Sequence, residues 1–149
     1  SEKSSAASLC HPSLWVLGVD TTVALGSTIL GKPGDADEAR AMLRKLSGKE
    51  HAVIGGYALE RRDCDQRITW LSETRVVMSL LTDGDIDWYI ATGEPFDKAG
   101  GYGIQGGAAR FVRSVEGSYT NVVGCDLALL VERLREVRLL DGGSVLRSC

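Results

Sequence analysis

The sequence lacks several features that would assign it to a class at once. Its four cysteines are scattered without a Cys-x-x-Cys pair, so neither a zinc ribbon nor a redox motif follows from their spacing. The 17 basic residues nearly balance the 20 acidic ones, and a net charge of −3 provides no cationic field for a nucleic-acid polymer. There is no run of about 18 apolar residues and no signal-peptide core. We therefore expect a cytoplasmic protein that binds neither nucleic-acid polymers nor membranes.

Glycine, by contrast, is concentrated in one place. The stretch from Gly93 to Gly106 reads GEPFDKAGGYGIQG and holds five of the 18 glycines together with an acid, a lysine and an amide. This density is typical of a loop whose backbone approaches a ligand closely. The stretch also contains a literal G-x-G-x-x-G, but a dinucleotide fingerprint requires a strand before it and a helix after it, and here the order is reversed. These glycines are better suited to a loop that binds a nucleotide base.

The hydrophobic periodicity predicts one α/β domain over residues 14–140, with a disordered leader over 1–13 and a C-terminal tail over 141–149. Asp35 with Glu38, and Thr82 with Asp85, are spaced as helix N-terminal capping pairs. We expect helices over 35–46, 86–91 and 127–137, and strands over 15–20, 51–59, 68–80 and 110–115. The strands 51–59 and 68–80, separated by a charged turn, should pair with each other.

Charged side chains near these elements are candidates for phosphate chemistry. Asp20 follows the first apolar run, and a carboxylate at a strand end can bind Mg²⁺ or orient water. Lys32 and Lys98 lie in glycine-flanked settings and can neutralise the charge of a triphosphate. Glu94 is a candidate second metal ligand, with a purely structural role as an equal alternative. For His51, beside a strand start, a structural role is favoured over a catalytic one.

Five segments in order, VLGVDTTV, ILGKP, LSGKEHAV, GEPFDKAGGYGIQG and GSYTNVVG, closely resemble the Maf family of nucleoside triphosphate pyrophosphatases. The resemblance covers about residues 15–139. The form DKAG-x-Y-x-IQG at 97–106 is similar to the branch that hydrolyses dTTP and UTP. It implies a Maf-like α/β fold with a mixed sheet flanked by helices, and hydrolysis of these nucleotides to the monophosphate and pyrophosphate.

The resemblance also implies roles for single residues. Asp20 would be the proton acceptor, Lys32 and Lys98 would hold phosphates, and Thr21 with Gln105 would read the base. A divalent metal, Mg²⁺ or Mn²⁺, would assist, with Asp20 and Glu94 as its ligands. A homodimer is an open alternative to a monomer.

One part of the family pattern is missing. Family members open with a strand leading to a Ser-Pro-Arg-Arg phosphate-binding turn, and no such segment precedes Asp20. We therefore expect an N-terminally truncated member. Two alternatives to an active enzyme stay open: a non-catalytic nucleotide-binding or septum-regulating protein, and an inactive fragment.

Overall fold

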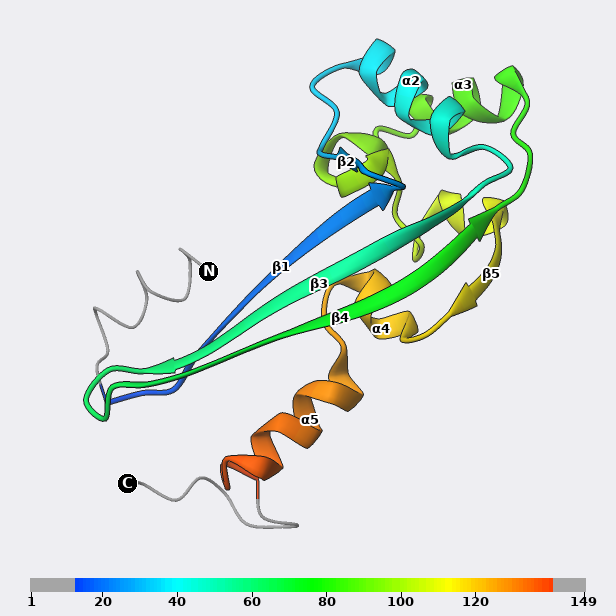
Figure 1. The fold of residues 1–149 in the computed structure, drawn as a ribbon. Helices are drawn as coiled ribbons and strands as arrows, with labels where there is room; N and C mark the ends of the chain where they lie inside the picture. Colours follow the sequence, from blue (N-terminus) through cyan, green and yellow to red (C-terminus); the bar gives the residue numbers. More distant parts are fainter. Residues whose placement is uncertain (1–12, 141–149) are drawn as a thin grey trace.

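The computed structural model describes residues 13–140, which form one antiparallel sheet with helices beside it (Figure 1). The strands lie in the order β2-β1-β3-β4-β5. Their bounds are β1 Val16–Leu25, β2 Thr28–Leu30, β3 Glu50–Arg61, β4 Gln66–Met78 and β5 Val112–Glu116. The predicted α/β class is confirmed. The mixed sheet is corrected, because all four strand pairings are antiparallel.

The first strand is longer than expected, and this changes the position of Asp20. The predicted strand ended at Asp20, whereas β1 continues to Leu25 before the turn at Gly26. The residues after Asp20 are β-branched threonines and valine, which favour extended backbone. Asp20 therefore lies in the middle of β1 rather than at its end.

Two helices begin at the capping residues expected from the sequence. In α2 (Ala36–Leu46), the backbone N–H of Glu38 donates to the Asp35 side chain at 2.8 Å. In α3 (Asp83–Ala91), Thr82 and Asp85 form a reciprocal capping box. Each cap satisfies N–H groups that the helix itself leaves unpaired. Both helices lie at one end of the long strands (Figure 1).

The hydrophobic core lies on one face of the sheet at this end. Val23 pairs with Val53 across β1 and β3, and Val76 of β4 pairs with His51, two residues before Val53 in β3. All three valines therefore project onto the same face of the sheet. Leu43 and Leu46 of α2 and Ile86 and Tyr89 of α3 pack against them, all at most 1% exposed. The core therefore joins β1, which carries Asp20, to α2 and to α3, the helix that leads into the glycine-rich stretch.

Several short elements escaped the sequence prediction. The glycine-rich stretch and its continuation form three 3-10 turns, η1 (Glu94–Asp97), η2 (Ala99–Gly101) and η3 (Gly107–Phe111). A short helix, α4 (Tyr119–Val123), precedes the predicted final helix, which is α5 (Leu127–Glu136). In Figure 1, α4 lies beside β4, and α5 lies farther from the sheet. These short elements, rather than the long strands, form most of the walls described below.

The predicted leader and tail fall on residues 1–12 and 141–149, which lie outside the described residues, so those domain bounds stay predictions. Within residues 13–140, no helix combines the length and the apolar character needed to cross a membrane.

Candidate active site

Two adjoining cavities lie where β1, the glycine-rich loop and α4 meet. The first, of about 210 Å³, is lined by β1 residues and by Lys32; the second, of about 610 Å³, is lined by the loop from Thr92 to Gly106. Five residues line both cavities: Asp97, Lys98, Tyr102, Val122 and Val123. Because they share this wall, the two cavities form one cleft, with room for a ligand of two distinct parts.

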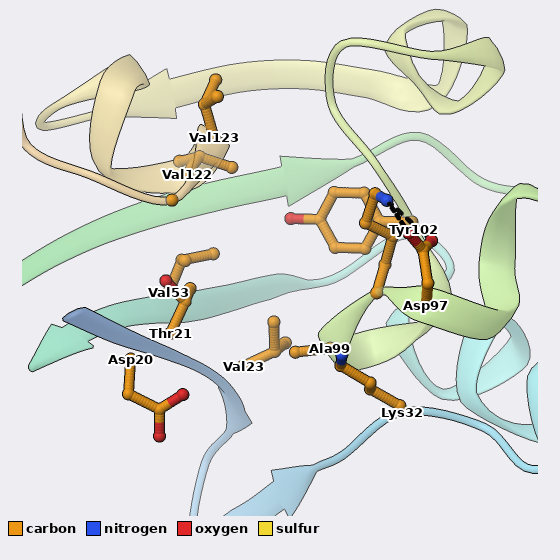
Figure 2. Close-up of a pocket in the computed structure, with 12 residues that line it drawn as sticks. Asp20, Thr21, Val23, Lys32, Val53, Asp97, Ala99, Tyr102, Val122 and Val123 are labelled. Carbon is orange, nitrogen blue, oxygen red and sulfur yellow. Dashed lines mark hydrogen bonds and ion pairs between the residues drawn. The ribbon is translucent and has the colours of Figure 1, made fainter. Parts of the chain in front are cut away.

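Asp20 and Lys32 both line the first cavity, as the predicted roles require. Since β2 pairs only with Val23–Leu25, the described part of the sheet ends at β1 beside Asp20. A cavity at a sheet edge can be lined from both faces of the strand, which explains why Asp20 and its neighbour Thr21 both contribute. In Figure 2 the Asp20 carboxylate lies at the rim of the pocket, well apart from Tyr102 and Asp97.

Lys98 also lines the first cavity, but it is already paired. Its Nζ lies 2.6 Å from each carboxylate oxygen of Asp97 (Figure 2). This contact with the Lys98 ammonium group, and to a smaller extent the charge of Lys32, lowers the pKa of Asp97. The pair is open to solvent, with exposed side-chain fractions of 46% for Lys98 and 72% for Asp97. Exposed pairs of this kind are weak, so a phosphate can compete for Lys98.

Asp97 is a residue that sequence reasoning did not single out. The pocket thus carries two carboxylates, Asp20 and Asp97, and two ammonium groups, Lys32 and Lys98. The available signal was its place directly before Lys98, which was predicted to bind phosphate.

Glu94 lies in the second cavity, separate from Asp20. Its carboxylate accepts hydrogen bonds from the Gly107 backbone N–H at 2.9 and 3.2 Å. The site is tight, since a Cβ added at Gly106 would lie 2.2 Å from Glu94 Oε2. These contacts stabilise the loop as η3 begins. The paired metal role of Asp20 and Glu94 stays a prediction, and neither cavity contains both.

The two predicted base-reading residues occupy opposite parts of the cleft. Thr21 lines the first cavity, on the same strand face as Val23, and Gln105 lines the second and is exposed. Tyr102 lies between the cavities and lines both. The structure therefore brings Thr21 and Lys32 to the first cavity and Gln105 to the second, with Lys98 on the wall that they share. A ligand that contacts both Thr21 and Gln105 must extend across Tyr102.

The wall made by α4 depends on a buried amide. Asn121 is 0% exposed, and its Nδ2 donates to the carbonyl oxygens of Val53 and Ser72 at 3.0 and 3.3 Å and to Thr74 Oγ1 at 3.1 Å. The Tyr57 hydroxyl donates to Asn121 Oδ1 at 3.1 Å. These bonds anchor α4 on the sheet and so hold Val122 and Val123 against the cleft. Hydrophobic periodicity could not predict this role, because a helix of five residues is too short to show a period.

The fit of a divalent metal can be judged from the side chains that line the cleft. Within residues 13–140, no group of three His, Cys, Asp or Glu side chains could hold a metal by itself. Mg²⁺ at phosphate sites is commonly bound by one or two carboxylates, with the remaining ligands from water and the phosphates. Asp20 and Asp97 each supply a carboxylate to the first cavity, and because the two lie apart in Figure 2, each can contribute a single ligand to a metal at its own end of the cavity. The residues therefore fit a metal that arrives with a phosphorylated substrate.

Comparison with known proteins identifies the family. A family model described as Maf-like protein matches residues 1–137. A dTTP/UTP pyrophosphatase of Desulfotalea psychrophila is 50% identical over 135 residues, covering 89% of this chain and 68% of that protein. The proteins of the same name from Bacillus cytotoxicus and Syntrophus aciditrophicus are 48% and 42% identical, over 96% and 92% of this chain and 72% and 67% of their own lengths. The segments that suggested the resemblance are those that build the cleft, and the chain belongs to the Maf-like family.

Proposed function

We propose that this protein hydrolyses dTTP and UTP to the nucleoside monophosphate and pyrophosphate. The observation that carries the proposal is the cleft in which two lysines and two carboxylates line one cavity and a glycine-rich loop with an exposed amide lines the next. A nucleoside triphosphate has the same two-part character, a polyanion joined to a polar base. The names of relatives that are 42–50% identical support the same substrates.

In the proposed reaction a water oxygen attacks the α-phosphorus and the bond from that phosphorus to the bridging oxygen breaks. Asp20 accepts the proton of the water, and the electron pair of the broken bond leaves with pyrophosphate. Lys32 and Lys98 offset the negative charge that develops on the departing oxygens, an effect that is largest where water is partly excluded. For this, the ion pair between Lys98 and Asp97 must be replaced by a contact between Lys98 and a phosphate oxygen.

A bound Mg²⁺ or Mn²⁺ would supply Lewis-acid polarisation of the phosphates. Asp20, with Asp97 or Glu94 as the alternative second carboxylate, would hold it. Thr21 and Gln105 would bind the base, and the amide of Gln105 can accept from N3–H of uracil or thymine while donating to a neighbouring carbonyl. We also propose that the protein is cytoplasmic and forms a homodimer. Cell fractionation tests the location, and size-exclusion chromatography tests the dimer.

The test is pyrophosphate release from dTTP and UTP by the purified chain with Mg²⁺, compared with its Asp20→Asn variant. The substitution keeps shape but removes the charge that accepts a proton, so we expect kcat to fall by about 10²–10⁴-fold while the protein stays folded. Asp37→Asn, an exposed substitution in the first turn of α2, is the matched control and should retain full turnover. Binding of dTTP without any turnover by the unmodified chain would instead support the non-catalytic alternative.

A further inference from the structure

A buried histidine that has no part in the proposed chemistry contacts the centre of the cleft. His51 in β3 is 3% exposed, and its Nε2 lies 2.7 Å from the hydroxyl oxygen of Tyr102, which is 5% exposed. The two rings meet edge to face, with centroids 5.4 Å apart. Tyr102 is one of the five residues that line both cavities. The hydrogen bond therefore joins the sheet to the junction of the two halves of the cleft.

The remaining nitrogen of His51 indicates where its proton resides. Nδ1 is buried and has no hydrogen-bond partner among residues 13–140. A proton on Nδ1 would bury an unpaired N–H donor, whereas a proton on Nε2 leaves only a lone pair unpaired and lets Nε2–H donate to the Tyr102 oxygen. Burial lowers the pKa of His51 to about 4, so the ring is neutral near pH 7. In this tautomer the hydroxyl proton of Tyr102 is not used by His51.

The position of Tyr102 suggests what that proton contacts. In Figure 2 the ring extends across the pocket from the loop, with its hydroxyl directed toward the side where Thr21 and Val122 lie. Of the predicted phosphate-binding lysines, Lys32 lines the first cavity and Lys98 lines both, whereas Gln105 lines the second. A nucleotide that extends across both cavities would place its sugar and α-phosphate at this junction. Burial also raises the pKa of the Tyr102 hydroxyl, which keeps it a donor.

We propose that Tyr102 is a substrate-binding residue whose hydroxyl donates to the sugar or α-phosphate of the nucleotide, and that His51 is the positioning residue that orients it. The inference rests on the proposed function for the identity of the nucleotide. The loop around Tyr102 is held independently: Gly100 N–H donates to the Gly31 carbonyl at 2.9 Å, and Gly103 N–H donates to the Tyr89 hydroxyl at 3.0 Å. Loss of the Tyr102 hydroxyl should therefore remove a donor without releasing the loop.

The experiment is calorimetric binding of two probes to the folded protein, without turnover. dTMP contains the sugar and α-phosphate, and pyrophosphate contains neither. We expect Tyr102→Phe to weaken dTMP binding about tenfold, the size of a hydrogen bond to a charged group, and to change pyrophosphate binding less than about twofold. Tyr119→Phe, which alters an exposed tyrosine, is the control and should change neither. Equal loss for both probes would show that the hydroxyl only stabilises the loop, and an unchanged dTMP affinity would exclude the contact; either result overturns the proposal.

The role of His51 has its own readouts. His51→Leu should weaken dTMP binding as much as Tyr102→Phe does. His51→Gln should weaken it less, because the glutamine amide can donate to the Tyr102 hydroxyl. The double variant that combines His51→Leu with Tyr102→Phe should bind dTMP no more weakly than either single variant. Nitrogen-15 shifts of His51 should show the proton on Nε2. A proton on Nδ1, or additive losses in the double variant, would overturn the positioning role. If the unmodified chain binds dTMP but does not hydrolyse dTTP, the proposed function fails and this inference is still tested.

Discussion

The neutral histidine in β3 makes stability depend on pH. His51 has a pKa of about 4 in the folded chain against an ordinary value of 6.5, because burial disfavours its charged form. Below pH 6.5 the unfolded chain binds a proton at His51 that the folded chain does not, so the contribution of His51 to stability is constant above that pH and falls as the pH decreases toward 4. The free energy of unfolding should decrease by about 3 kcal/mol between pH 6.5 and pH 4 because of His51. Urea unfolding at pH 7.5, 6 and 5 should show this slope, and the slope should be shallower in His51→Gln.

Base choice should depend on a single side chain, Gln105, which lines the second cavity. If Gln105 pairs with the base, Gln105→Leu leaves polar groups of uracil or thymine unpaired in the cleft. We expect kcat/KM for dTTP and UTP to fall by a factor that corresponds to about 1–3 kcal/mol of lost transition-state stabilisation. The kcat/KM for a purine nucleotide should change less. Steady-state rates with dTTP, UTP and dGTP measure this. An equal loss for all three would indicate that Gln105 only structures the loop.

At the scale of elements, the α4 wall depends on one glycine in β3. A Cβ added at Gly55 would lie 2.3 Å from Asn121 Oδ1 and 2.9 Å from the Tyr57 ring, whereas one added at Gly56 meets nothing closer than 3.8 Å. Gly55→Ala should therefore destabilise the protein by about 1–3 kcal/mol through overpacking and displace α4. Gly56→Ala is the neighbouring control. The free energy of unfolding and the KM for dTTP should both change in Gly55→Ala and stay unchanged in Gly56→Ala. Equal values for the two variants would show that the space beside Gly55 is not needed for Asn121.

Some of these elements could be predicted from the sequence and others could not. The helices α2 and α3 and the β3–β4 pair were predictable because their caps and alternation are local properties of 10 or so residues. The three residues of β2 and the five of α4 are too short for periodicity, and α4 is held by bonds from Asn121 to strands that are 47 to 68 residues away in the chain. Asp20 was found as a candidate but misplaced within its strand, since nothing local ends β1 before Gly26. The Asp97–Lys98 and His51–Tyr102 contacts required the three-dimensional structure.

The cleft is formed where β1, the glycine-rich loop and α4 meet on one sheet. Gly100 shows how closely they meet: its φ is +72°, and an added Cβ would lie 3.0 Å from Val23. Because the walls come from distant parts of the chain, a ligand that contacts several of them binds the folded state and not the unfolded one. Such a ligand raises global stability by mass action.

This predicts that dTMP increases the thermal midpoint of the entire domain in a single transition. At a concentration 100 times its Kd the gain is about 2.7 kcal/mol, which corresponds to roughly 10 °C for a domain of this size. Lys98→Met should reduce the increase in thermal midpoint that dTMP causes. Lys98 lines both cavities, and its ammonium group can bind the phosphate of dTMP after it separates from Asp97. Arg133→Met, which alters an α5 side chain paired with Glu136 and lining neither cavity, should keep the full shift. Calorimetry over a series of dTMP concentrations measures both, and equal shifts in the two variants would place the nucleotide outside this cleft.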